Sequence, residues 1–189
     1  MQQAREIENI ALIGFMGTGK SSVAHALAGL LHFQVVDTDA LIEELAGQSI
    51  TDIFTQQGEV RFRQLEREVV AKVGQLRRTV IATGGGLGAD PENLASLQRH
   101  ALVVCLWASP DAIWERVRHQ SHRPLLAGPD PLGKIRELLA RREPVYRQAD
   151  VLVNTELRSV REVASQVAHQ YRLMRRPFQN ENQDPAAGA

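Results

Sequence analysis

Five short apolar runs are spaced along the chain, and polar stretches with helical character lie between them. Within each run the apolar residues do not alternate with polar ones, which is typical of β-strands covered on both faces. The runs span Ile10–Ile13, Gln34–Val36, Thr79–Ala82, Leu102–Trp107 and Val151–Val153. We therefore expect five strands buried in the middle of the molecule.

Helical periodicity fills the segments between these runs. Apolar residues recur every three or four positions in Ser22–Leu31 and in Glu59–Val73, and Pro91 and Pro110 each suit the first position of a further helix. Strict alternation of strand and helix favours an α/β fold, with a five-stranded parallel sheet flanked by helices on both faces. In such sheets ligands bind at the carboxyl ends of the strands.

The composition is typical of a single globular domain. The last helical pattern, Ser159–Met174, precedes a stretch rich in Gln, Asn, Pro and Ala, so we expect one domain over residues 1–174 and a disordered tail over residues 175–189. Lys and Arg equal Asp and Glu at 22 each, which argues against nucleic acid or a membrane surface as partner. The single cysteine, Cys105, lies in an apolar run, and no signal peptide is visible. We expect an inert thiol in a cytoplasmic monomer.

A glycine-rich loop connects the first apolar run to the first helix. From Gly14 to Ser21 it has the sequence G-F-M-G-T-G-K-S, which matches G-x-x-x-x-G-K-[ST] in the strand-to-helix context that this motif requires. Backbone N–H groups of such a loop surround phosphate oxygens, Lys20 can reach the β- and γ-phosphates of ATP, and the Ser21 hydroxyl can bind Mg²⁺. The residues expected to contact nucleotide here are Gly14, Gly17, Thr18, Gly19, Lys20, Ser21 and Ser22.

Two acidic residues, Asp37 and Asp39, follow the second run. At the carboxyl end of a strand, one of them could face a metal and the other a substrate hydroxyl. The alternative is structural, since this segment could also cap the helix expected over Ala40–Ala46. The residues alone leave both interpretations open.

Two further features indicate where a molecule that accepts the phosphate could bind. Arg63 and Glu66 are three residues apart on one helix face, so they form either a surface ion pair of little energetic value or a rigid fork for a substrate carboxylate. Gly84, Gly85 and Gly86 follow the third run, and three consecutive glycines favour a close approach of backbone to ligand.

Taken together, these motifs resemble the shikimate kinase family from about Ile7 to Met174. The resemblance includes the phosphate loop, the D-x-D pair and the triple glycine. It also includes three longer segments, namely G-E-x-x-F-R-x-x-E from Gly58, R-P-L-L from Arg123 and R-x-P-x-Y from Arg142.

The resemblance implies a role for each matching residue. ATP is the phosphate donor and Mg²⁺ the cofactor, bound by Ser21 and Asp37. Asp39 orients or deprotonates the 3-hydroxyl of shikimate. Arg63 and Arg142 hold the shikimate carboxylate, and Gly85 offers its backbone to the substrate. Arg123 approaches the ATP phosphates, and Arg116 lines the adenine.

A lid is expected over about residues 118–130. The segment holds His119, Pro124 and Gly128 and lies between two helical patterns, a composition that favours a mobile loop. Closing such a lid would exclude water and bring Arg123 to the transferring phosphoryl group.

Other functions share parts of this pattern. A GTP switch would need an Asn-Lys-x-Asp motif, which the sequence lacks. His119 and His122 have the spacing of metal ligands, but no Cys or acid cluster joins them. The serious alternative is another small-molecule kinase with a gluconate or nucleoside monophosphate acceptor.

Overall fold

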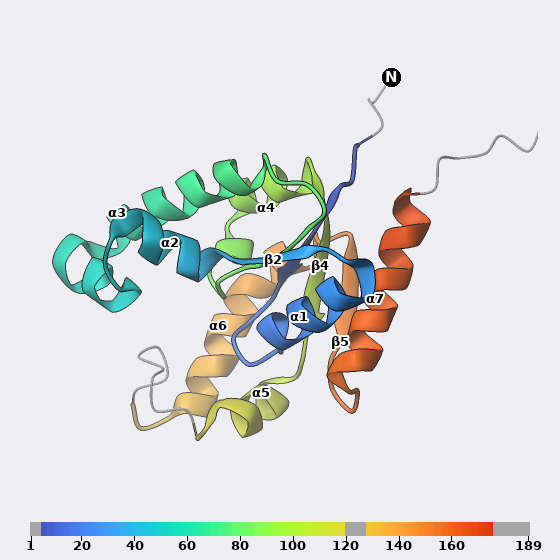
Figure 1. Ribbon diagram of the computed structural model, residues 1–189. Helices are drawn as coiled ribbons and strands as arrows, with labels where there is room; N and C mark the ends of the chain where they lie inside the picture. Colours follow the sequence, from blue (N-terminus) through green and yellow to red (C-terminus); the bar gives the residue numbers. More distant parts are fainter. Residues whose placement is uncertain (1–4, 120–127, 176–189) are drawn as a thin grey trace, which may run out of the picture.

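The computed structural model describes residues 5–119 and 128–175 (Figure 1). The strands are β1 (Asn9–Ile13), β2 (Gln34–Asp37), β3 (Thr79–Ala82), β4 (Ala101–Trp107) and β5 (Val151–Asn154). The helices are α1 (Lys20–Leu31), α2 (Thr38–Ala46), α3 (Ile50–Val73), α4 (Pro91–Gln98), α5 (Pro110–Val117), α6 (Pro131–Tyr146) and α7 (Val160–Arg175), with a 3₁₀ turn η1 (Leu87–Ala89).

The described strands form a single parallel sheet in the order β2-β3-β1-β4-β5. This confirms the expected five-stranded parallel sheet, and the expected strand limits agree with the observed ones to within a residue. β1 lies in the centre, between β3 and β4. The loops that follow β1, β2 and β3 therefore emerge side by side at the carboxyl edge of the sheet.

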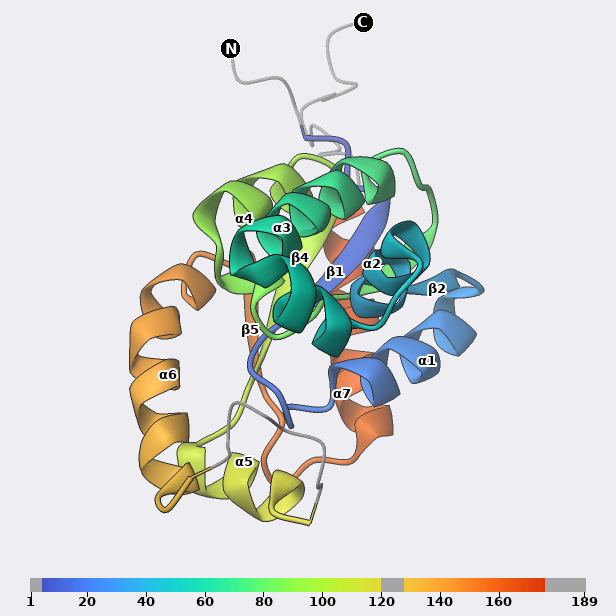
Figure 2. The same cartoon turned by 90° about the vertical axis from the view of Figure 1, so that its left-hand side faces the viewer.

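Side chains of the central strand alternate between two hydrophobic cores. Ile10 and Leu12 pack with residues of α1 and α7, whereas Ala11 and Ile13 pack with residues of α3, α4 and α6. Figure 2 shows these two groups of helices on opposite sides of the sheet. Because both faces of the strand are covered, apolar residues occupy every position except Asn9.

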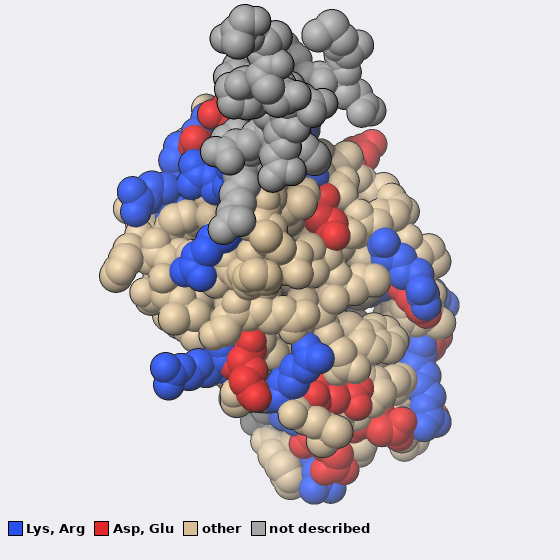
Figure 3. All heavy atoms as spheres, turned by 90° about the vertical axis from the view of Figure 1, so that its right-hand side faces the viewer, with Lys and Arg blue, Asp and Glu red and all other residues tan. Residues whose placement is uncertain are grey.

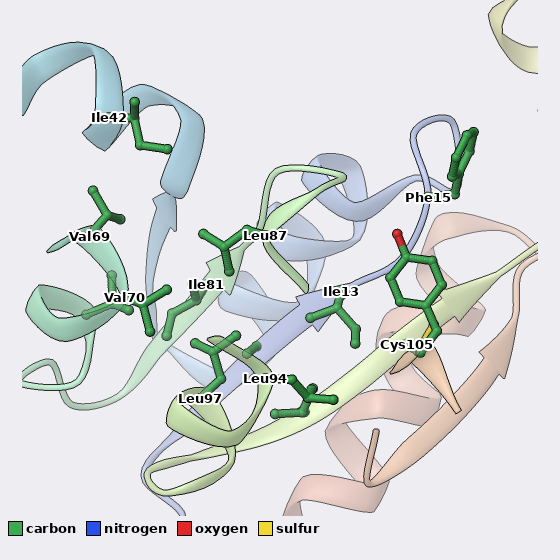
Figure 4. Packing of buried hydrophobic residues seen from close by; sticks show 14 of the residues in the cluster. Ile13, Phe15, Ile42, Val69, Val70, Ile81, Leu87, Leu94, Leu97 and Cys105 are labelled. Carbon is green, nitrogen blue, oxygen red and sulfur yellow. The ribbon is translucent and has the colours of Figure 1, made fainter. Parts of the chain in front are cut away.

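The core beneath α3 and α4 is continuous from the sheet to the helices. Figure 4 shows Ile13 and Ile81 of the sheet together with Val69 and Leu94 of the covering helices. Cys105 belongs to this core, and burial raises the pKa of its thiol to about 12. The expectation of a buried, inert thiol agrees with this environment.

Several helices begin where a side chain caps them, which corrects some of the expected limits. Asp37 caps α2 by accepting hydrogen bonds from the Asp39 and Ala40 N–H groups, so this helix begins at Thr38 rather than Ala40. The helix expected from Glu59 is the second half of α3. A kink at Gly58, where φ is 77°, separates it from a first half that Ser49 caps. The helix expected from Ser22 begins at Lys20, inside the phosphate loop.

None of the helices in the described part of the chain combines the length and apolar character needed to cross a membrane. The expected tail falls almost entirely outside the described residues, which end at Arg175 in α7.

Candidate active site

The loop after β1 has a defined shape that suits phosphate. Gly14 has a φ of 132°, and a Cβ at this position would overlap the Leu106 carbonyl oxygen of β4, so only glycine fits. The Lys20 Nζ donates to the carbonyl oxygens of Gly14 and Phe15, at 2.9 Å each. These bonds hold a buried ammonium group over the loop, directly at the N-terminus of α1, where the helix dipole favours an anion.

A hydrogen bond joins the start of α2, directly after β2, to the loop that follows β3. The Gly84 N–H donates to the Thr38 Oγ1 at 2.9 Å, across 46 residues of sequence. The Asp39 carboxylate lies against Gly84 so closely that a Cβ at Gly84 would overlap it. Asp39 and the first glycine of the triple are thus held in direct contact.

Arg63 approaches the same glycines from α3. Its Nη1 donates to Glu66 at 2.7 Å and its Nη2 to Glu59 at 2.9 Å, and a Cβ at Gly86 would lie 3.0 Å from its Nη1. Glu66 has only 2% of its side chain exposed. Burial raises the pKa of Glu66, and the hydrogen bond from Arg63 opposes that rise. The pair is therefore partly buried, because Arg63 keeps 32% of its side chain exposed, and Glu66 holds the guanidinium beside the glycine triple.

Arg142 reaches the glycines from the opposite side, on α6. Its Nη1 donates to the Gly85 carbonyl oxygen at 2.9 Å, and its guanidinium carbon lies 5.2 Å from the centroid of the Phe15 ring. The Tyr146 hydroxyl donates to the same Gly85 oxygen at 2.8 Å. Two donors from one helix thereby fix the middle glycine of the triple.

The glycine triple also meets the phosphate loop. A Cβ at Gly85 would lie 3.5 Å from the backbone nitrogen of Met16, which belongs to the loop after β1. Asp39, Arg63 and Arg142 therefore surround a strip of side-chain-free backbone that borders the phosphate loop. This arrangement can bind a negatively charged molecule beside the phosphates of a nucleotide and place a carboxylate next to it.

Two side chains near the phosphate loop, Ser21 and Asp37, are candidate metal ligands. Ser21 is exposed at the start of α1, and the capping bonds of Asp37 use its Oδ1, so its Oδ2 can serve a ligand. Residues 5–119 and 128–175 contain no group of three His, Cys, Asp or Glu side chains able to hold a metal ion. One hydroxyl and one carboxylate suit Mg²⁺, which usually keeps several waters and binds nucleotide phosphates, better than a metal enclosed by protein.

One expected cofactor residue, Arg116, lies beside the phosphate loop, and another, Arg123, is outside the described residues. Arg116 on α5 donates to the Gly17 carbonyl oxygen at 3.3 Å and to Thr155 Oγ1 at 2.9 Å, which places it beside the phosphate loop. Arg123 and most of the expected lid fall within residues 120–127, outside the described residues.

Three supporting residues were not identified from the sequence as part of the site. They are Thr38, Glu59 and Tyr146, which bind Gly84, Arg63 and Gly85 respectively. Tyr146 did carry a signal, because it ends the R-x-P-x-Y segment four residues after Arg142, one helical turn away. Thr38 carried none, since its partner is remote in the sequence.

Comparison with known proteins places the chain in one family. The family model described as shikimate kinase matches residues 16–172. A shikimate kinase from Caldanaerobacter subterraneus subsp. tengcongensis is 44% identical over 165 residues, which cover 87% of this chain and 96% of the relative.

Solved structures agree with this placement. Shikimate kinase from Acinetobacter baumannii, in complex with shikimate, superposes with a TM-score of 0.84 at 33% identity, covering 92% of this chain and 97% of the other. A gluconokinase from Sinorhizobium meliloti 1021 has a TM-score of 0.55 at 17% identity, covering 93% of this chain and all of the other, which shows a common fold alone. The family model over residues 16–172 and the 44% identical relative show that the chain belongs to the shikimate kinase family.

Proposed function

We propose that this protein transfers the γ-phosphate of ATP to the 3-hydroxyl of shikimate, giving ADP and shikimate 3-phosphate. The observation that carries the proposal is the convergence of Asp39, Arg63 and Arg142 on the glycine triple, next to the phosphate loop. Two guanidinium groups suit a substrate carboxylate, and the Asp39 carboxylate beside Gly84 suits a substrate hydroxyl. All three residues come from one chain, which supports the expected monomer as the active form.

In the reaction, the arginines position the acceptor and Asp39 acts on it. Arg63 and Arg142 hold the shikimate carboxylate, and the backbone around Gly85 contacts the ring. Asp39 accepts the proton of the 3-hydroxyl as its oxygen attacks the γ-phosphorus, while the bond between that phosphorus and the bridging oxygen of ADP breaks. Lys20 stabilises the charge that spreads over the phosphoryl oxygens.

Mg²⁺ would be held by Ser21 and Asp37 together with the phosphates, and it would neutralise charge on the phosphate oxygens. By the family resemblance, Arg123 would add a further positive charge near the phosphates, and Arg116 would line the adenine. The position of Arg116 beside the phosphate loop supports a role close to the nucleotide.

The direct test is a coupled assay of ADP release with Mg²⁺, ATP and one acceptor at a time. Shikimate, quinate, gluconate and nucleoside monophosphates are the acceptors to compare. We expect release to depend on shikimate and on Mg²⁺, with shikimate 3-phosphate as the product by mass spectrometry. Release stimulated by gluconate or a nucleoside monophosphate, and not by shikimate, would show that the acceptor is wrongly assigned.

Glu66→Gln is expected to raise the KM for shikimate roughly tenfold or more and to leave the KM for ATP within about twofold. The buried carboxylate is the inner of the two partners of Arg63, and a hydrogen bond between charged groups is worth about 1.5–3 kcal/mol. Steady-state kinetics with each substrate varied in turn measures both constants. Glu68→Gln makes the same chemical change on the exposed face of α3 and should alter neither constant.

Tyr146→Phe is expected to raise the KM for shikimate about two- to tenfold, because one neutral hydrogen bond to Gly85 is worth about 0.5–1.5 kcal/mol. Arg142 still holds the same carbonyl, so the loop should shift rather than unfold. A purely structural role would lower the melting temperature without separating the two substrates. Ser96→Ala, which removes a surface hydroxyl on α4, is the matched control. Equal changes in the KM of ATP and shikimate would contradict the assigned position of Tyr146.

A further inference from the structure

A hollow of about 710 Å³ lies at the opposite end of the sheet, where the strands begin. It is bordered by the last residues of α1 and α7 and by the segments that precede β1, β2 and β3. Its volume falls within the range of small-molecule sites. In the proposed reaction no substrate reaches this end of the molecule.

The hollow carries a strong positive charge. Among the described residues that line it are Arg77, Arg78, Arg172 and Arg175, against a single acid, Glu8, a formal charge of +3 in a chain whose net charge is zero. Figure 3 shows blue side chains gathered at the upper left of the face that α7 occupies. Such a cluster concentrates anions around itself.

Among the described residues, most of the arginines of the hollow form no ion pair with a carboxylate. Arg77 forms an ion pair with Glu8, with its Nε 2.6 Å from the Oε2. Within residues 5–119 and 128–175, Arg78, Arg172 and Arg175 form no ion pair with an acid. Three guanidinium groups at one hollow repel each other, and a bound anion would relieve that repulsion.

Two of the guanidinium groups are held in place by aromatic rings. The guanidinium carbon of Arg78 lies 5.7 Å from the centroid of the Phe33 ring, and that of Arg175 lies 5.7 Å from the Tyr171 ring. The two rings contact each other edge to face at 5.5 Å, and the Tyr171 hydroxyl donates to the Glu8 carbonyl oxygen at 3.1 Å. Side chains fixed in this way lose little entropy when they bind a ligand.

The backbone of Arg78 is also fixed in an uncommon conformation. Its φ is 52°, in the left-handed region that residues other than glycine seldom adopt. Its N–H donates to the Glu8 carbonyl oxygen at 3.2 Å, and its own carbonyl oxygen accepts from the Gln34 N–H at 3.0 Å. The starts of three strands thus hold this arginine at the hollow.

Helix stability explains only part of the cluster. Arg172 and Arg175 lie in the last turn of α7, where positive charge is favourable to the helix dipole. Arg77 and Arg78 lie in the loop before β3. Arg77 donates to the carbonyl oxygens of Gly74 and Leu76, just beyond the end of α3, whereas Arg78 lies at no helix end. Because Arg77 and Arg78 lie across from the end of α7, four arginines line the hollow and not two.

We propose that this hollow is a second anion site, which binds a small molecule carrying two or more linked phosphate groups. Arg78, Arg172 and Arg175 supply the planar, bidentate donors that suit phosphate oxygens. The site is separate from the phosphate loop, because it lies at the amino ends of the strands whereas the loop lies at the carboxyl end of β1.

The test is a titration of the ¹⁵N-labelled full chain with inorganic tripolyphosphate, followed by amide NMR shifts. The phosphate loop will respond as well, and the shifts distinguish the two sites by position. We expect saturable shifts at Phe33, Arg78 and Tyr171 in addition to those of the loop. Citrate at matched ionic strength should shift the hollow at least about tenfold more weakly, which separates a phosphate site from a general attraction for anions.

Charge-matched variants make the test specific. Arg78→Asn with Arg175→Gln should weaken the response of the hollow at least about tenfold while leaving the response of the loop unchanged, and Asn tolerates the left-handed backbone at position 78. Arg172→Gln with Arg175→Gln avoids the strained position altogether and should also weaken it. The control is Arg67→Gln with Arg161→Gln, two exposed arginines elsewhere. Shifts confined to the phosphate loop, or equal weakening in the control, would overturn the proposal.

Discussion

Replacing Lys20 by alanine is expected to lower turnover with ATP and shikimate by about 10²–10³-fold, the usual effect of losing one electrostatic contact to a transition state. The Lys20 Nζ is buried and held by the carbonyl oxygens of Gly14 and Phe15, so its charge is already in place above the loop. Charge that is positioned before the reaction needs no reorganisation during it. The rate of ADP release at saturating concentrations of both substrates measures the effect.

Stability has to be followed in the same variant, because the two hydrogen bonds of Lys20 also support the loop. Thermal unfolding of Lys20→Ala separates a lost charge from a lost fold. Lys72→Ala removes an exposed lysine in the last turn of α3 and should leave turnover unchanged. A folded Lys20→Ala protein that retains wild-type turnover would exclude the proposed role of this lysine.

Replacing Asp39 by asparagine is expected to lower kcat by about 10²–10⁴-fold, the range for loss of a general base, and to change the KM for shikimate much less. Asparagine has nearly the same shape, so it fits against Gly84 as the carboxylate does. It cannot accept the proton of the substrate hydroxyl. Initial rates over a range of shikimate concentrations give both constants.

The matched control is Asp111→Asn, which makes the same change at an exposed position on α5, where 68% of the side chain is accessible. It should leave kcat within about twofold of wild type, as is usual for surface substitutions. If Asp39→Asn instead raised the KM for shikimate and left kcat intact, Asp39 would bind the acceptor without acting on its proton.

The two variants test different parts of the site, and their outcomes are independent. Lys20 belongs to the phosphate loop, which the motif alone indicated. Asp39 belongs to a constellation that also involves Gly84, Arg63 and Arg142 and that exists only once α3 and α6 have packed against the sheet. A loss of activity in both variants would support a site in which nucleotide and acceptor lie side by side.

Much of the fold could be predicted because its signals are local. Each strand is an uninterrupted apolar run, since both faces of a parallel sheet are covered, and β3 was predicted to the residue. Helix limits were less accurate where a polar side chain decides them. Because Asp37 caps it, α2 begins two residues earlier than its apolar pattern suggests. The half of α3 that precedes the kink at Gly58 was not predicted.

The candidate site shows the same difference between local sequence signals and contacts that depend on tertiary packing. The phosphate loop could be recognised from the sequence because its motif is contiguous and its chemistry follows from spacing. The acceptor-site residues were indicated by their resemblance to the shikimate kinase family. The sequence left open whether Arg63 and Glu66 form a surface pair or a fork, and whether Asp37 caps a helix or serves a ligand.

Tertiary packing alone shows that the buried Glu66 holds Arg63, that Asp37 caps α2 through its Oδ1 and that Tyr146 holds Gly85. Only it brought Arg77 and Arg78 to the end of α7, 94 residues or more away along the chain. The physical reason is that burial and hydrogen bonds between distant residues depend on strand order and helix packing, and the spacing of residues along the chain does not encode these locally.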